Sequence, residues 1–179
     1  MNERKMNVNL FQLFKAALME PKKQAAVRML GIGKIMQYIF GLILLITIIS
    51  FIELALGFGD ATSEMEGLLQ YIEEIRWLLY PFAFVSLFVS TTLYHFIKIS
   101  FFAWIGLGML RVMKRKGEYR HLWRTTALAV TLPTLLSLAA SYITAGLLLP
   151  MLAASITVLY LYLAIRFYPK MPVAQKNRS

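Results

Sequence analysis

The stretch WLLYPFAFVSLFVSTTLYHFIKISFFAWIGLGMLRVM, residues 77–113, decides how this chain folds. It is 37 residues long, and its only basic or charged side chains are His95, Lys98 and Arg111. A continuous helix of that length would measure roughly 55 Å, against about 30 Å for the hydrocarbon core of a bilayer. The stretch is therefore too long for one simple span and too short for two.

The composition of the whole chain is that of a membrane protein. Hydrophobic residues make up 59% of the 179 positions and charged residues 16%, whereas soluble domains have about 45–50% and about 25%. Several apolar runs reach the ~20 residues that a helical span requires, and the ~10-residue alternation of barrel strands is absent. The sequence predicts an all-α, polytopic membrane protein with one integral membrane domain, residues 1–179.

The hydropathy pattern predicts about four transmembrane helices, preceded by a short amphipathic helix. Apolar residues from Val8 to Leu18 recur at helical spacing with polar residues opposite, which is typical of a helix lying in the headgroup region. An acidic loop follows the first span, and Pro133 lies inside the third. The predicted ranges are 8–19 for the interfacial helix, 35–56, 77–113, 122–143 and 147–168 for the transmembrane helices, and 57–76 for the external loop.

The distribution of lysine and arginine predicts the topology. Seven lie in the segment up to Lys34, six between Arg111 and Arg124, and four from Arg166 onward, but only Arg76 lies in the acidic loop. The positive-inside rule places both termini and the 111–124 segment in the cytoplasm, with the loop outside. Residues 77–113 must then cross once, as one overlong helix that is tilted or bent. Pro81 and the pair Gly106 and Gly108 are the expected bend points.

Two polar stripes are the candidate functional site. Side chains spaced about one helical turn apart in the long helix and in the third span are expected to face each other, because hydrocarbon offers them no partner. One interpretation is a polar cavity in which Lys98 contacts an anion or headgroup and His95 responds to protons. The other is that the hydroxyls join helices and Lys98 reaches the cytoplasmic interface. The stripe residues are Ser86, Ser90, Thr91, Tyr94, His95, Lys98, Thr134, Ser137 and Ser141.

The net charge of +10 indicates contact with anionic lipid headgroups. In a membrane protein, positive-inside bias and lipid attraction account for such a charge, and we expect no nucleic acid partner. The expected lipid contacts are Lys22, Lys23, Arg28, Lys34, Lys114, Arg115, Lys116, Arg120 and Arg124.

No set of residues in the sequence predicts catalysis, a metal site or a cofactor. Cysteine is absent, which excludes disulfides and thiolate chemistry. The two histidines, His95 and His121, do not form a His-Glu-x-x-His motif. Asp60 is the only aspartate, and no Gly-x-Ser-x-Gly elbow occurs. We therefore expect a protein that is not an enzyme.

Two stretches carry a resemblance to a known family. The first runs from Phe11-Gln12-Leu13-Phe14-Lys15 through Pro21-Lys22 to Gly31-Ile32-Gly33-Lys34. The second is the basic segment 114–124, followed by Thr131-Leu132-Pro133. In these, the chain resembles a bacterial membrane family known as domain of unknown function 1189, some of whose members are labelled maltodextrin utilization proteins. It resembles Yip1-type membrane domains more distantly.

The resemblance implies a location in the plasma membrane of a Gram-positive type of bacterium, but no reaction and no functional residues. Members of the family often have a larger extracytoplasmic segment than this chain, so a function residing there is not carried over.

The sequence therefore leaves two functions open. The first is a non-enzymatic accessory, scaffold or lipid-interacting factor of the bacterial cytoplasmic membrane, whose protein partner is a second copy or another membrane protein. The alternative is a small transporter, or a subunit that translocates lipid or solute along the Ser86–Lys98 stripe.

Overall fold

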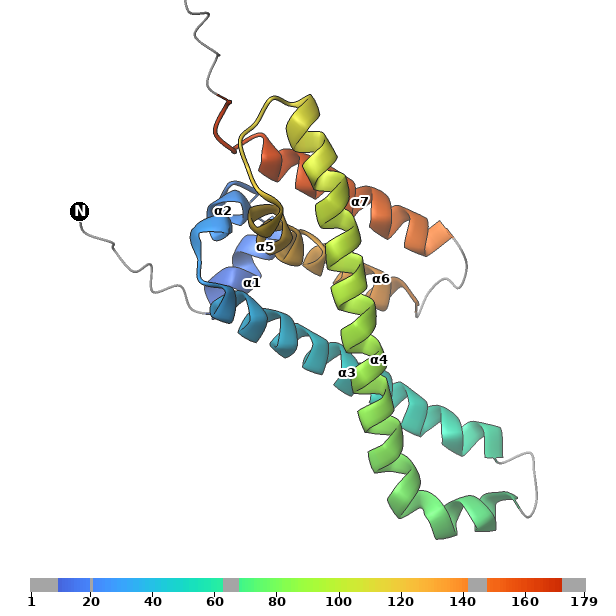
Figure 1. Ribbon diagram of the computed structural model, residues 1–179. Coiled ribbons are helices and arrows are strands. Elements are labelled where there is room, and N and C mark those ends of the chain that lie inside the picture. The colour runs from blue at the N-terminus through green and yellow to red at the C-terminus, as the bar shows by residue number, and fades with distance from the viewer. Residues whose placement is uncertain (1–9, 20, 63–67, 142–147, 172–179) are drawn as a thin grey trace, which may run out of the picture. The chain divides into compact units, whose positions relative to one another are not determined.

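The chain folds almost entirely into helices (Figure 1). The structure, a computed structural model, describes residues 10–19, 21–62, 68–141 and 148–171. Within these ranges the only β-type pairing is an isolated bridge between Arg115 and Lys170. The elements are α1 (Leu10–Met19), α2 (Pro21–Ala26), the 3-10 helix η1 (Val27–Met29), α3 (Ile32–Thr62), α4 (Leu68–Val112), α5 (Tyr119–Ala129), α6 (Thr131–Ser141) and α7 (Leu148–Ile165).

Four helical segments among the described residues are long and apolar enough to cross a membrane. They are Ile32–Gly57 in α3, Glu74–Val112 in α4, Tyr119–Ala140 across α5 and α6, and Leu148–Ile165 in α7. The predicted all-α class and the number of spans are confirmed.

The long helix is one continuous element of 45 residues, as predicted, but it begins at Leu68. The preceding helix α3 continues beyond Leu56 to Thr62. The predicted loop over 57–76 is therefore wrong at both ends, and residues 63–67 of it lie outside the described ranges. A glycine inside a helix costs only about 1 kcal/mol, so Gly57 and Gly59 do not end α3.

α4 begins at Leu68 and not at Trp77. Leucine and isoleucine recur at helical spacing from Leu68 onward, and this pattern continues without interruption into the span. Pro81 removes one backbone hydrogen bond inside α4, and Figure 1 shows the first turns of α4 at an angle to the turns that follow. The helix runs through Gly106 and Gly108 to Val112.

The predicted third span, residues 122–143, consists of two helices that meet at Val130. Pro133 has no N–H to bond the carbonyl of Ala129, and its ring crowds that carbonyl. The backbone stays nearly helical on both sides, because Val130 N–H donates to Thr126 O at 3.0 Å and Thr134 N–H to Val130 O at 3.0 Å. The proline therefore divides the span without stopping it.

The chain divides into two compact units, which we describe separately. Unit 1 comprises residues 1–38 and 98–179, and unit 2 comprises residues 39–97. Unit 2 is a hairpin of α3 and the first part of α4, held by aromatic contacts. The ring of Phe51 meets those of Tyr80 and Phe84 edge-on, at centroid distances of 6.0 and 5.4 Å.

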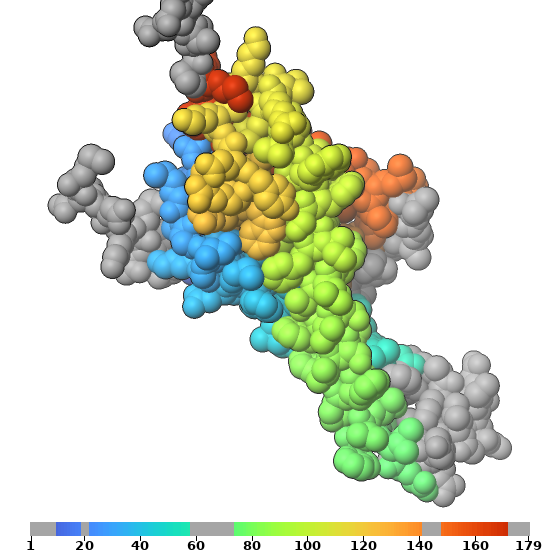
Figure 2. All heavy atoms as spheres, viewed as in Figure 1, coloured from blue at the N-terminus to red at the C-terminus, as the bar shows by residue number. Residues whose placement is uncertain are grey.

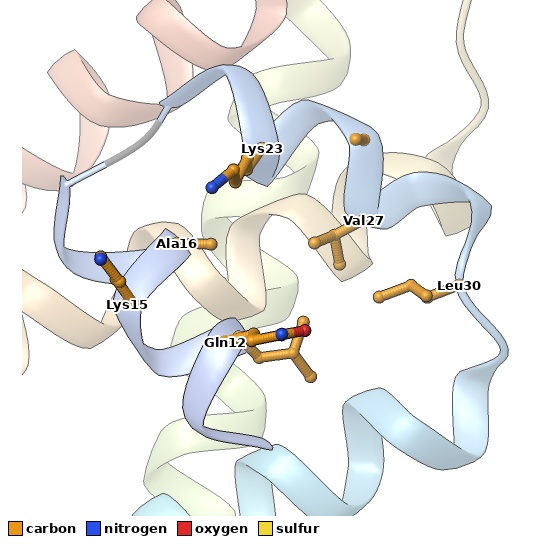
Figure 3. A pocket seen from close by; sticks show the side chains of 8 residues that line it. Gln12, Lys15, Ala16, Lys23, Val27 and Leu30 are labelled. Carbon is orange, nitrogen blue, oxygen red and sulfur yellow. The ribbon is translucent and has the colours of Figure 1, made fainter. Parts of the chain in front are cut away.

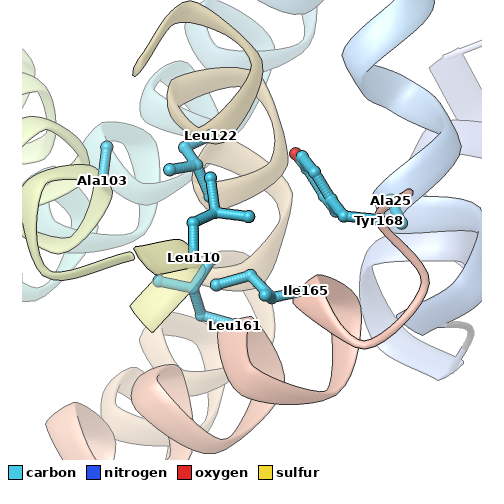
Figure 4. Packing of buried hydrophobic residues seen from close by; sticks show 7 residues of the cluster. All are labelled: Ala25, Ala103, Leu110, Leu122, Leu161, Ile165 and Tyr168. Atoms are coloured by element: carbon cyan, nitrogen blue, oxygen red, sulfur yellow. The ribbon is translucent and has the colours of Figure 1, made fainter. Parts of the chain in front are cut away.

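Unit 1 contains a buried apolar cluster to which α2, α4, α5 and α7 contribute (Figure 4). Gly106 allows close approach within it, since a Cβ there would lie 2.9 Å from Leu161 Cδ2 and 3.2 Å from Leu122 Cδ2. Small residues at such crossings let helices pack in membranes without a hydrophobic driving force. The cluster is Ala25, Ala103, Leu110, Leu122, Leu161, Ile165 and Tyr168.

The amphipathic helix predicted over 8–19 is α1, and it packs into unit 1. Leu13, Ala16 and Ala17 are buried. The side-chain amide of Gln24, itself buried, donates to Ala16 O at 3.2 Å and Ala17 O at 2.9 Å, which satisfies carbonyls in the last turns of α1. Phe11 stays exposed. Contact of α1 with the headgroup region remains a prediction.

The basic turn after α4 is joined to the chain that follows α7. Lys116 N–H donates to Pro169 O at 2.8 Å, and Met171 N–H to Lys114 O at 3.0 Å. The Arg115 guanidinium donates to Tyr168 O at 2.8 Å. The basic turn 114–116 and the described residues that follow α7, up to Met171, therefore lie together in unit 1.

Candidate functional site

The stripe predicted in the long helix does not form a single face. Ser86, Ser90 and Tyr94 are exposed, Thr91 is half-buried and His95 is 2% exposed. Successive side chains four residues apart are offset by about 40° around a helix, so a run of them winds around it. In unit 2, one imidazole nitrogen of His95 hydrogen-bonds Thr91 O at 3.0 Å.

One contact joins the two predicted stripes, between Lys98 and Thr134 in unit 1. Lys98 Nζ donates to Thr134 Oγ1 at 3.1 Å, linking α4 to α6. Lys98 is half-buried and Thr134 is buried. Ser137 is half-buried, and the side chain of Ser141 is outside the described set. This contact fits the interpretation of hydroxyls that hold helices together.

Sequence reasoning missed two buried polar contacts of the same kind. Tyr38 OH lies 2.9 Å from Thr131 Oγ1, joining α3 to α6. Tyr168 OH lies 2.7 Å from Thr125 Oγ1, tying the end of α7 to α5. A lone tyrosine inside an apolar run was the available signal at Tyr38, since its hydroxyl requires a partner in hydrocarbon.

The residues predicted to contact anionic lipid all belong to unit 1. Unit 2 has six of the nine carboxylates of the chain but only one of its nineteen lysines and arginines, Arg76. Among the described residues of unit 1, Glu118 is the only carboxylate side chain, and it pairs with Arg120 at 2.6 Å. The two units therefore differ strongly in charge.

An open cavity of about 480 Å³ in unit 1 is lined by four basic or titratable side chains and Met29. Arg28 comes from η1, and Arg120, His121 and Arg124 come from the first turns of α5. Among the described residues, one terminal nitrogen of Arg28 and Nε of Arg124 are buried without a hydrogen-bond partner.

Contacts with other groups of unit 1 hold Arg124 and Arg28 in position. One terminal nitrogen of Arg124, Nη1, donates to both Arg28 O and Leu30 O, each at 2.9 Å. The Arg28 guanidinium lies 4.8 Å above the ring centre of Tyr168, a cation–π contact. Burial raises the pKa of the Tyr168 phenol, while its hydrogen bond to Thr125 and the nearby Arg28 charge act in the opposite direction. The phenol is therefore neutral at physiological pH.

Two further cavities border α2 and η1. One of about 580 Å³ is lined by Lys22, Lys23, Ala25, Ala26, Arg28, Met29 and Phe167, so it shares Arg28 and Met29 with the arginine cavity. The other, of about 470 Å³, lies between α1 and α2–η1. Figure 3 shows Lys15 and Lys23 on one side of it and Val27 and Leu30 on the other. A basic rim next to apolar walls is chemistry that suits an amphiphile.

Metal-ligating side chains do not cluster in the described part of the chain: no group of three or more His, Cys, Asp or Glu residues there is placed to hold an ion.

Comparison with known proteins finds one family. Residues 57–165 match the sequence profile of a family described as "Protein of unknown function (DUF1189)". No curated protein and no solved structure matches the chain. The match covers more than half of the sequence, and it gives no support to the more distant resemblance to Yip1-type membrane domains.

Proposed function

The chain belongs to the DUF1189 family, whose description names no activity, and from its geometry we propose a function in binding anionic lipid. In this proposal it is a non-enzymatic, multi-pass protein of a bacterial cytoplasmic membrane, with both termini in the cytoplasm. Basic unit 1 binds anionic headgroups, and the protein serves as an accessory or scaffold factor for a second copy or for another membrane protein.

The observation that carries the proposal is the difference in charge between the units. Lysine and arginine near a membrane surface are each attracted to anionic lipid by about 1 kcal/mol. Their concentration in unit 1, with one described carboxylate among them, suits a surface facing such headgroups. The scarcity of lysine and arginine in unit 2, which has only Arg76, suits an extracytoplasmic connection between α3 and α4.

The exposed surface of α4 supports the membrane setting. Large apolar side chains of its unit 2 part are each at least half exposed, and Figure 2 shows α4 at the surface on the face in view. So many exposed large apolar side chains on one helix are unusual in soluble monomers and suit lipid tails. These residues are Trp77, Leu78, Phe82, Val85, Val89, Leu93 and Ile97.

The test is lipid-dependent thermal stability of the full chain in neutral detergent. Phosphatidylglycerol is expected to raise the melting temperature more than phosphatidylcholine does, and 0.5 M salt is expected to reduce the difference, because exposed charges are screened within a few ångströms at such salt concentrations. Simultaneous substitution of Lys22, Lys23 and Lys116 by Gln should also reduce the difference in melting temperature between the two lipids. Arg76→Gln, in unit 2, is the control. Equal stabilisation by both lipids would contradict the proposal.

Transport along the Ser86–Lys98 stripe stays a prediction that the structure does not test. Reconstituted vesicles with wild-type protein and with Lys98→Ala measure it directly, since a transporter gives flux that the variant reduces without loss of folding.

A further inference from the structure

We propose that the cavity formed by Arg28, Arg120, His121 and Arg124 is a binding site for a phosphate group, with an anionic phospholipid headgroup as the expected source. The inference rests on the proposed contact with anionic lipid and names the site and the chemical group.

The charge of the cavity is unbalanced. Three arginines line it, and Glu118, bound to Arg120, is the only described carboxylate in unit 1. Charged nitrogens withdrawn from water without an acceptor are costly. Arg28 and Arg124 each have such a nitrogen among the described residues. An anion in the cavity would balance this positive charge.

Two arginines of the cavity are already held in position. Backbone carbonyls of Arg28 and Leu30 fix Arg124, and the ring of Tyr168 supports Arg28. Side chains that are already held lose little conformational freedom when a ligand binds. The planar guanidinium presents paired donors that match two oxygens of a phosphate, so arginine suits this group better than lysine does.

The neighbouring cavity of about 580 Å³ indicates that the phosphate belongs to a lipid. It shares Arg28 and Met29 with the arginine cavity and adds Lys22, Lys23 and the exposed ring of Phe167. If the phosphate of a phospholipid lies at the arginines, the glycerol and the first acyl carbons of that lipid can reach the apolar side chains of the neighbouring cavity. Lysines next to them can meet a second charged or hydroxyl-bearing part of the headgroup.

The experiment is isothermal titration calorimetry on the full chain in neutral detergent. The probes are dihexanoyl-phosphatidylglycerol, dihexanoyl-phosphatidylcholine and inorganic phosphate. Wild type should bind the phosphatidylglycerol saturably and more tightly than the phosphatidylcholine. Arg28→Gln should weaken that binding about tenfold or more, since it removes a charge-assisted contact. Arg166→Gln removes an equal, exposed charge of unit 1 that lines none of these cavities and should leave Kd within about twofold.

A second variant covers the case in which Arg28→Gln fails to fold, which its melting temperature will show. Arg28→Lys keeps the charge and loses the paired donors, so it should fold and still bind several-fold more weakly.

The two sources of phosphate separate in the same titrations. Saturable binding of inorganic phosphate, competing with the lipid, supports a site for free phosphate. Binding of phosphatidylglycerol alone supports a site for the headgroup. The phosphate site is overturned if neither probe binds saturably, or if Arg28→Gln and Arg166→Gln weaken binding equally. If the two variants weaken binding equally but wild type still binds phosphatidylglycerol more tightly than phosphatidylcholine, the proposed function stands without this site. No preference in wild type would contradict both.

Discussion

Lys114 has a backbone φ of 51°, the only positive φ among the described residues other than glycine. It follows α4 at the position where helices favour glycine. Arg115 N–H donates to Leu110 O at 2.9 Å and Lys114 N–H to Arg111 O at 3.1 Å, the hydrogen-bond pair of a Schellman motif. A side chain in this left-handed conformation costs roughly 1–2 kcal/mol.

Lys114→Gly is therefore expected to stabilise the protein by about 1 kcal/mol. Reversible unfolding in mixed micelles measures the change. Lys116→Gly is the matched control, because it removes the same charge in the same turn without a positive φ to relieve. The expectation fails if both variants change the unfolding free energy alike.

At the level of single residues, the sequence predicted that the stripes containing Lys98 and Thr134 would face each other, because both are polar groups in apolar helices, but it did not predict the hydrogen bond between these two side chains. It could not predict the contact of Thr125 with Tyr168. Those residues are 43 positions apart, and their meeting depends on how α5 and α7 pack. The arginine cavity was foreseen only as separate charges, since periodicity does not say that η1 lies against α5.

Gly106 and Gly108 are two residues apart in α4 but have different surroundings. A Cβ on Gly106 would meet two leucines at 3.2 Å or less, whereas one on Gly108 would have no atom within 4 Å. We expect Gly106→Val to destabilise the protein by about 1–3 kcal/mol through overpacking. Gly108→Val should change stability by no more than about 0.5 kcal/mol.

The measurement is again unfolding in mixed micelles, and Gly106→Ala provides an intermediate step. Since the nearest atoms are the ends of leucine side chains, alanine should cost less than valine does. Equal effects of valine at positions 106 and 108 would show that α4 does not pack at Gly106.

Helix boundaries could be predicted where the chain has a residue that interrupts helical hydrogen bonding, such as proline. Pro133 was placed in the third span and accounts for the division into α5 and α6. The ends of α3 and α4 were misjudged because charged residues and glycines were taken to mark a loop. Helical structure continues to Thr62 and is present again from Leu68, as those residues tolerate a helix and no proline lies between Leu56 and Trp77.

The proposed topology places the two units' charges on opposite sides of the membrane, and the absence of cysteine makes this simple to check. Glu74→Cys and Lys116→Cys both introduce an exposed thiol. An impermeant thiol reagent added to intact cells should label only Glu74→Cys, because the positive-inside rule puts position 116 in the cytoplasm.

Both variants should react after the cells are opened, which controls for accessibility. Labelling of Lys116→Cys in intact cells would reverse the proposed orientation. It would also place the arginine cavity on the outer surface.

For the whole molecule, composition and charge were sufficient to predict the helical class, the number of spans and the basic segments. They did not predict that the chain would form two units, with residues 39–97 inserted between the two parts of the other. That division depends on contacts between residues far apart in sequence, which local patterns do not encode.

This insertion sets an order for biosynthesis. The carbonyl of Gln24 accepts a hydrogen bond from Thr125, which is synthesised 101 residues later. The carbonyl of Leu18 accepts one from Tyr160, which is synthesised 142 residues later. At cellular translation rates the second delay is on the order of ten seconds. The hairpin of unit 2 is synthesised well before then, so we expect it to enter the membrane while the amino-terminal helices still lack their partners. Assembly of unit 1 is therefore the last folding event, and a ribosome that stalls before α7 leaves a protein that is inserted but unfinished.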